Sequence, residues 1–536
     1  MTDPLADPIA EPITEPPRSS GRSSALVAAG IFLSRLLGLL RQSLIARYLG
    51  AGLVADAFNG AFRLTNFLQN LFGEGALSAS FIPVYANALA RNEEEEADRI
   101  AGAVGAILAL VVAIIVLLGI LAAPLVVQLV VGGFTGEKLE LTIRLTRILF
   151  PGAGIFVLSA WCLGILNSHR RFFLSYVAPV FWNLAMIGAL VAFGPRRGEV
   201  ELAVILAWAS VAGAVLQMAV QLPTVFRLLH RPRFRLDLAY PPVREAVRNF
   251  LPAFVSRGVV QLSGFIDIWL ASHIPVNGVV TLLQNAQTIY VLPISLFGMS
   301  VSAAELPEMS RDTGSGPAAF DRLRVRMNAA LPRVAFFVVP SAVGFFVLGE
   351  AIAGVLLQYG KFTHTDTLRT WAILAGSAVG LLASALGRLY SSTFYALRDT
   401  RTPLRFAIAR VLLTGVLGYL FAFPLPRLLG LPAWTGAAGL TASAGIAGWV
   451  EFLLLRRAIT ARIGRTGIPP AALVRLWGAA LLAGGAGWGV MQLVDPAHHL
   501  VRGIAAIVAF ALVYGLATLA LGVPEATALV RRARRR

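Results

Sequence analysis

Five polar side chains recur at helical spacing within residues 55–88: Asn59, Arg63, Asn66, Asn70 and Glu74. On an α-helix these positions form one stripe about 80° wide. Because a polar stripe of this length cannot face lipid, it forms either a seam of hydrogen bonds between helices or one wall of a water-filled cavity. In the cavity interpretation, Glu74 pairs with Arg63 or with an arginine of the preceding apolar segment.

That preceding segment, residues 24–49, contains Arg35, Arg41 and Arg47. Steps of six residues turn a helix by about 240°, so the three arginines do not share one narrow face. Arg47 is near the end of the segment, where a long side chain can snorkel to the membrane surface. Arg35 and Arg41 lie deeper, and ionisable groups at such depth indicate a functional site.

Three later apolar segments also contain polar groups: Arg257, Gln261 and Asp267; Gln284, Asn285, Gln287 and Thr288; and Arg388. Arginines outnumber carboxylates among the intramembrane groups. The expected ligand is therefore anionic, and phosphate suits the forked guanidinium group.

The composition predicts that these residues are carried by membrane helices. Of the 536 residues, 57% are hydrophobic and 14% are charged, and the mean hydropathy is +0.74. Many apolar runs exceed the roughly 20 residues that cross a bilayer as a helix, whereas barrel strands are short and alternating. We therefore predict an all-α integral membrane protein with fourteen spans: 24–49, 55–88, 100–123, 147–167, 173–194, 200–226, 248–272, 279–304, 334–358, 368–396, 404–423, 432–455, 472–494 and 499–522.

The distribution of basic residues predicts the orientation. With the N-terminus cytoplasmic, 30 of the 46 Lys and Arg residues lie in cytoplasmic segments and nine on the opposite side, as the positive-inside rule requires. Both termini are then cytoplasmic. Because the charges of the +18 net total are spread between spans, we do not expect nucleic-acid binding. Residues 1–23 lack the pattern of a signal peptide and are predicted to be a disordered tail.

Enzyme signatures are weak. The sequence has no Walker loop, and its loop histidines lack carboxylates at metal-ligand spacing, so we expect no metal, no cofactor and no use of ATP. An ion gradient, the membrane potential or the substrate gradient would drive transport. The single cysteine, Cys162, is expected to pack in a span. Asp399 beside Arg398 is the nearest enzyme candidate, but it lies in a short turn.

Several stretches together resemble the MurJ (MviN) family: SRLLGLLR (34–41), GAG (50–52), DAF (56–58), FGEGA (72–76), FIPV (81–84), LN (166–167), RF (171–172), QYGKFT (358–363) and FYALRDTRTP (394–403). The resemblance implies two six-helix lobes of the multidrug-exporter (MATE-like) type and two C-terminal helices around a central cavity. The expected domains are a tail (1–23), an N-lobe (24–227), a C-lobe (228–455) and a final segment (456–536).

The resemblance also implies a lipid II flippase of the bacterial inner membrane. Its substrate would be the undecaprenyl-pyrophosphate-linked disaccharide-pentapeptide, with membrane lipids and cell-wall synthesis proteins as partners. Arg35, Arg41, Asp56, Glu74 and Arg388 match family positions of like charge. The pyrophosphate site is expected to comprise Arg35, Arg41, Arg63, Arg257, Arg388, Gln261, Asn66 and Asn70. The expected gating groups are Asp56, Glu74 and Asp267.

The sequence departs from the family pattern in two places. Gln69 and Asn70 stand where the family has a basic pair, and residues 284–291 carry no charge. Arg257 and Asp267 are additional charges that either compensate or indicate another substrate. The alternatives are therefore a flippase for another polyprenyl-linked glycan or a scaffold that binds the precursor without moving it. A drug exporter and a membrane glycosyltransferase or phosphatase rank lower.

Overall fold

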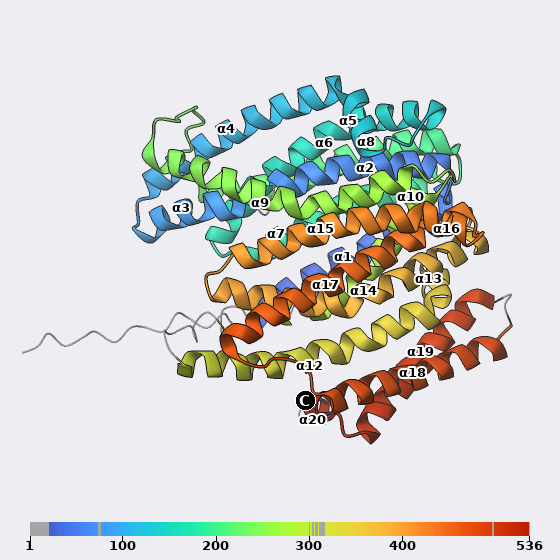
Figure 1. Ribbon diagram of the computed structural model, residues 1–536. Helices are drawn as coiled ribbons and strands as arrows, with labels where there is room; N and C mark the ends of the chain where they lie inside the picture. The colour runs from blue at the N-terminus through green and yellow to red at the C-terminus, as the bar shows by residue number, and fades with distance from the viewer. Residues whose placement is uncertain are drawn as a thin grey trace, which may run out of the picture.

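The computed structural model is built from helices that lie side by side and end at two common faces (Figure 1). It describes residues 21–72, 77–299, 301–302, 305, 309, 317–495 and 498–534, and no strand occurs among them. The predicted all-α class is therefore confirmed.

The helices of the first half are α1 (Gly21–Leu49), α2 (Leu53–Phe72), α3 (Ser78–Ala90), α4 (Glu94–Leu121), α5 (Ala123–Val130), α6 (Gly136–Ser168), α7 (Phe172–Phe193) and α8 (Glu199–Leu228). The span predicted at 55–88 is divided between α2 and α3. α5 is a short helix at the end of α4, with Pro124 in its first turn, where the missing N–H of proline costs no helical hydrogen bond.

The second half contains α9 (Pro241–Ser272), α10 (Val279–Pro293) with the π-helical turn η2 (Ile294–Met299), α12 (Pro317–Val347), α13 (Gly349–Leu357), α14 (His364–Ala396), α15 (Arg401–Ala422), α16 (Pro424–Leu428), η3 (Ala433–Thr435) and α17 (Gly436–Ile463). The chain ends with α18 (Pro470–Leu493), α19 (His499–Ala520) and α20 (Pro524–Arg534). Among the described residues, helices thus lie within each of the fourteen predicted spans.

Eleven helices of the described part are long and apolar enough to cross a membrane. α1, α2 and α9 are not among the eleven. These three helices carry most of the intramembrane charges that the sequence singles out. Charge on a membrane helix is tolerated where the helix faces protein or water rather than lipid, so the least apolar helices are expected inside the bundle.

The helices pack as two lobes. In the N-lobe (α1–α8), α1 lies along α7, α2 along α6, and α8 along both α6 and α7. In the C-lobe (α9–α17), α14 lies along α12 and α17, and α15 along α17. The pair α18 and α19 packs on α12 and α13, at the lower right of Figure 1. This is the predicted two-lobe arrangement; the exact domain limits remain a prediction.

Asp399, the nearest enzyme candidate, is a helix cap. Its carboxylate accepts hydrogen bonds from the backbone N–H groups of Arg401 (3.1 Å) and Thr402 (3.0 Å), and from the Thr402 hydroxyl (2.7 Å). It also pairs with Arg462 at 2.6 Å. The bonds from Thr402 and then the pairing with Arg462 lower the pKa of Asp399 to about 2. This stabilisation is present above the ordinary carboxyl pKa and is lost as the pH falls toward 2.

Candidate functional site

The two lobes meet closely at one end of the bundle, at four interhelical turns. These turns join α1 to α2, α5 to α6, α9 to α10 and α13 to α14. The N–H of Lys361 donates to the carbonyl of Arg47 across the lobes (2.8 Å), and the N–H of Gly133 donates to the Ser272 hydroxyl (3.1 Å). We call this region the sealed end.

Asp56 is at the centre of the sealed end and is fully buried. Its carboxylate pairs with Lys138, at the start of α6, over 2.6 Å. From the C-lobe it accepts hydrogen bonds from the N–H groups of Gly278 and Thr281 (both 2.8 Å) and from the Thr281 hydroxyl (2.9 Å). A carboxylate on the N-lobe thus caps the first turn of α10 on the C-lobe, where backbone N–H groups and the helix dipole favour negative charge.

Three further polar contacts cross the lobes near Asp56. The Asn59 amide donates to the Thr281 hydroxyl (3.2 Å), and the Gln42 amide donates to the Asn285 oxygen (2.6 Å). At the surface, Lys361 pairs with Glu199 over 2.8 Å. Buried side-chain hydrogen bonds are costly to break without replacement, so the sealed end is a specific interlocking of the lobes.

Gly278 allows the backbones to approach each other at this seal. Its φ is +92°, and an added Cβ would collide with the carbonyl of Ala51. We therefore expect Gly278→Ala to open the sealed end. The readout is labelling of Ala46→Cys, a buried lobe-interface position, by a membrane-impermeant maleimide in a Cys162→Ser background.

The matched control for this prediction is Gly522→Ala. Gly522 also has a positive φ, +63°, but an added Cβ meets no atom within 4 Å. It therefore shares the strain of about 1–2 kcal/mol without the collision. Equal labelling of Ala46→Cys in both glycine variants would contradict the proposed close approach.

Arg41 on α1 is held by side chains of α7 and α2. Its Nη1 donates to the side-chain oxygen of Asn183 (3.0 Å), and its guanidinium carbon lies 4.3 Å from the ring centroid of Trp182 and 5.7 Å from that of Phe62. Among the described residues, its buried Nε has no hydrogen-bond partner. Arg41 is thus fixed in direction and keeps an unused donor, as a group preorganised for an anion would.

A second set of charges lies in the C-lobe. Arg410 on α15 pairs with Glu451 on α17 over 3.0 Å. Arg388 on α14 is exposed. Asp267 on α9 lies within the electrostatic influence of Arg410 and of Arg63 from the N-lobe, and its buried Oδ1 lacks a hydrogen-bond partner in the described structure. Cationic groups therefore line parts of both lobes.

The polar stripe of α2 serves two purposes. Asn59 belongs to the sealed end, where its hydrogen bond to Thr281 agrees with the interpretation of the stripe as a seam between helices at this position. Arg63 contacts α9 near Gly264, while Asn66 is half-buried and Asn70 is exposed. The stripe begins at the contact between the lobes. Its first residue, Asn59, therefore bonds across the lobes and is not free to line a cavity.

The other predicted site residues are placed as follows. Arg35 is exposed on α1, and Gln261 is half-buried on α9. Arg257 falls on α9, but its side chain lies outside the described residues, as does Glu74 altogether. Sequence reasoning missed Lys138, Asn183 and Arg410 as partners.

Known proteins resemble the chain over most of its length. Residues 45–508 match the protein family described as "Lipid II flippase MurJ". The "Probable lipid II flippase MurJ" of Rhizobium tropici is 33% identical over 432 residues, covering 79% of this chain and 77% of that protein. The chain belongs to the MurJ family. The "Lipid II flippase MurJ" of Burkholderia cenocepacia is 32% identical, covering 80% of this chain and 81% of that protein.

Solved structures agree with this assignment. A structure described as "Lipid II flippase MurJ, inward closed conformation" superposes with a TM-score of 0.76 at 25% identity, covering 93% of this chain and 99% of that one. An inward-facing MATE transporter of the MOP superfamily superposes with a TM-score of 0.62 at 19% identity, covering 82% of this chain, which shows the fold. This MurJ-family chain is thus a multi-pass membrane protein of a transporter family.

Proposed function

We propose that this protein carries lipid II from the cytoplasmic to the outer leaflet of the bacterial inner membrane by alternating access. The observation that carries the proposal is the buried Asp56 cap, which locks one lobe to the other at one end of the bundle. Family membership supplies lipid II as the substrate. A protein that alternates access needs such a seal, made of contacts that rearrange as a unit.

The sealed end is the outer end in the predicted topology, so the substrate enters from the cytoplasmic side. Its pyrophosphate would be bound by the five arginines Arg35, Arg41, Arg63, Arg257 and Arg388. The amides of Gln261, Asn66 and Asn70 would add neutral hydrogen bonds. Forked guanidinium groups suit phosphate oxygens, and the fixed direction of Arg41 favours it as the first contact.

Rocking of the lobes would then open the sealed end. The step separates Asp56 from the N-terminus of α10, while Lys138 stays beside Asp56 because both residues are on the N-lobe. Glu74 and Asp267 are proposed to exchange arginine partners during the same movement. Asp267 lies within the electrostatic influence of Arg63 on the N-lobe and Arg410 on the C-lobe, and such an exchange needs arginines on both sides.

The deciding experiment replaces the resident lipid II flippase of a bacterium with this protein. The readout is cleavage of lipid II by a toxin added outside the inner membrane. Restored growth together with cleavage supports the proposal. If the protein is inserted and lipid II stays protected, lipid II flipping is rejected.

The uncharged stretch 284–291 favours one other candidate, a flippase for a different polyprenyl-linked glycan. Its Asn285 is engaged with Gln42 of the N-lobe, so part of this stretch holds the lobes together rather than binding substrate. Protected lipid II would direct the search to other prenyl-linked glycans. Binding without movement would indicate a scaffold.

A further inference from the structure

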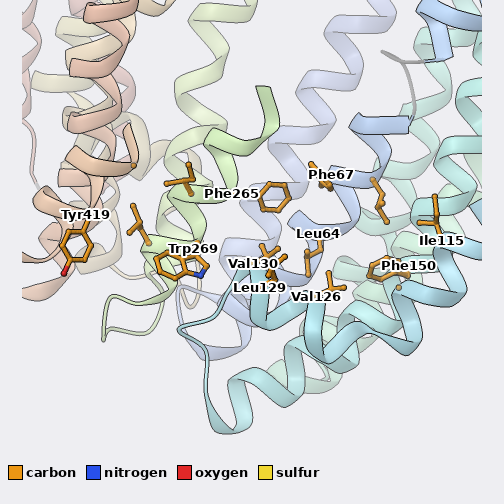
Figure 2. Close-up of a pocket in the computed structure, with 15 residues that line it drawn as sticks. Leu64, Phe67, Ile115, Val126, Leu129, Val130, Phe150, Phe265, Trp269 and Tyr419 are labelled. Carbon is orange, nitrogen blue, oxygen red and sulfur yellow. The ribbon is translucent and has the colours of Figure 1, made fainter. Parts of the chain in front are cut away.

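An apolar groove between the lobes lies apart from the charged residues. It has a volume of about 790 Å³, within the roughly 300–1,000 Å³ of pockets for single small ligands. Figure 2 shows Phe67, Phe265 and Trp269 among the side chains that line it. Its walls are α2, α4, α5 and α6 of the N-lobe and α9 and α15 of the C-lobe.

The face of α2 toward this groove is not its polar face. Leu64, Phe67 and Leu68 line the groove, whereas Arg63 and Asn70 belong to the polar stripe. At about 100° per residue the centres of the two sets are separated by roughly a third of a turn. α2 thus divides an apolar space on one side from polar groups on the other.

The surroundings of the groove are lipid-facing. On α4, Leu117, Leu118 and Leu121 are exposed, and on α15 Leu412 and Val416 are exposed. Both helices are long and apolar enough to span a membrane. Within the groove, Leu129 is 74% exposed, so the space communicates with the hydrocarbon of the bilayer.

The chemistry of the lining excludes a headgroup. The lining residues are aliphatic, aromatic or glycine, and their polar side-chain groups are the indole N–H of Trp269 and the hydroxyl of Tyr419. Both aromatic residues are within the last five residues of their helices, toward the sealed end. Amphipathic rings at such a level are typical of the membrane interface, and an apolar cavity of this kind takes up apolar ligands rather than water.

We propose that the groove binds an acyl chain of a membrane phospholipid from the leaflet at the sealed end. Because its walls belong to different lobes, the chain bridges them and stabilises the sealed conformation. In the sealed conformation a phospholipid chain is favoured over the prenyl tail of a substrate, because the groove adjoins the sealed end. Substrate enters at the opposite end and reaches the leaflet at the sealed end only after the lobes have rocked. The lipid site does not depend on which glycan is transported.

The first test is photolabelling of the full-length protein in phospholipid vesicles. The probe is a phosphatidylethanolamine with a diazirine in its acyl chain, and labelled peptides are mapped by mass spectrometry. We expect labelling to concentrate on α5, α9 and the end of α15. Uniform labelling of all lipid-facing helices would overturn the proposal.

Gly415→Phe is the variant that fills the groove. An added Cβ at Gly415 has only Ile266 as a neighbour, at 3.9 Å, so the ring has room. The matched control is Gly489→Phe on α18, where an added Cβ meets nothing within 4 Å. Groove labelling should fall several-fold in Gly415→Phe and stay unchanged in Gly489→Phe. Leu129→Trp, at an exposed position, gives the same test if Gly415→Phe is poorly inserted.

A second measurement tests the bridging role. In the Cys162→Ser background, phosphatidylethanolamine added to detergent-purified protein should lower maleimide labelling of Ala46→Cys several-fold. Gly415→Phe should abolish this response to lipid. The phospholipid site would be rejected if Gly415→Phe still responded to lipid. It would also be rejected if a photoreactive polyprenyl phosphate labelled the groove and the phospholipid probe did not. Neither result bears on lipid II flipping.

Discussion

Arg41→Ala should lower lipid II translocation by at least about 10- to 100-fold, because one hydrogen bond to a charged group contributes roughly 1.5–3 kcal/mol. The guanidinium is oriented by its hydrogen bond to Asn183 and by the ring of Trp182, and alanine removes this oriented positive charge. The measurement is toxin cleavage of lipid II in cells that depend on the variant.

Two companion variants separate binding from folding. Arg41→Lys keeps the charge but loses the fork, and should retain partial activity. Asn183→Ala keeps Arg41 and removes its hydrogen-bond partner. Lipid II translocation should therefore fall less in Asn183→Ala than in Arg41→Ala. Membrane insertion is checked for each by immunoblotting. Normal cleavage in an inserted Arg41→Ala protein would remove the central claim about the anion site.

Asp56→Ala should shift the protein away from the sealed conformation. The change leaves Lys138 without its partner and the first turn of α10 without its cap. Loss of a helix cap alone costs about 0.5–2 kcal/mol, and an unpaired buried charge costs more. We expect maleimide labelling of Ala46→Cys from outside to rise at least several-fold, and translocation to fall.

The control for Asp56 is Asp237→Ala. Asp237 pairs with Arg99 at the opposite end of the bundle, where both side chains are partly exposed and such a pair contributes little. It should leave labelling and translocation unchanged. The double variant Asp56→Ala/Lys138→Met should be less impaired than Asp56→Ala, since it removes the stranded charge. An unaltered labelling rate in Asp56→Ala would refute the assignment of Asp56 to the seal.

The sequence predicted the helical class and the family. The resemblance to the family also drew attention to Asp56, which the structure pairs with Lys138, while its gating role stays a prediction. Hydropathy and the N-terminal motif are local features of the sequence. Both can be recognised without knowing which residues are in contact in the folded protein. The partners of Asp56 could not be predicted, because Lys138 is 82 residues away and Thr281 is 225 away. Neither Lys138 nor Thr281 belongs to a repeating sequence pattern that would identify it as a partner of Asp56.

The polar stripe of α2 also shows what the sequence could and could not predict. Helical spacing placed Asn59 and Arg63 on one face of α2, and both point toward the C-lobe. Spacing could not tell that Asn59 would form a buried hydrogen bond with Thr281. That distinction depends on how far α10 extends along α2, which is set by packing between lobes rather than by the sequence of either helix.

The pairing of Asp56 with Lys138 has an electrical consequence. Both charges are on the N-lobe, so they travel together when the lobes part, and their sum is zero. Moving one elementary charge across a membrane potential of 100 mV involves about 2.3 kcal/mol, but a neutral couple that moves as a unit contributes almost nothing. The Asp56–Lys138 couple is therefore electrically silent. Voltage dependence of transport would arise from other charges: the cross-lobe pair Lys361–Glu199, the remaining intramembrane carboxylates, and the arginines with the phosphates that they bind.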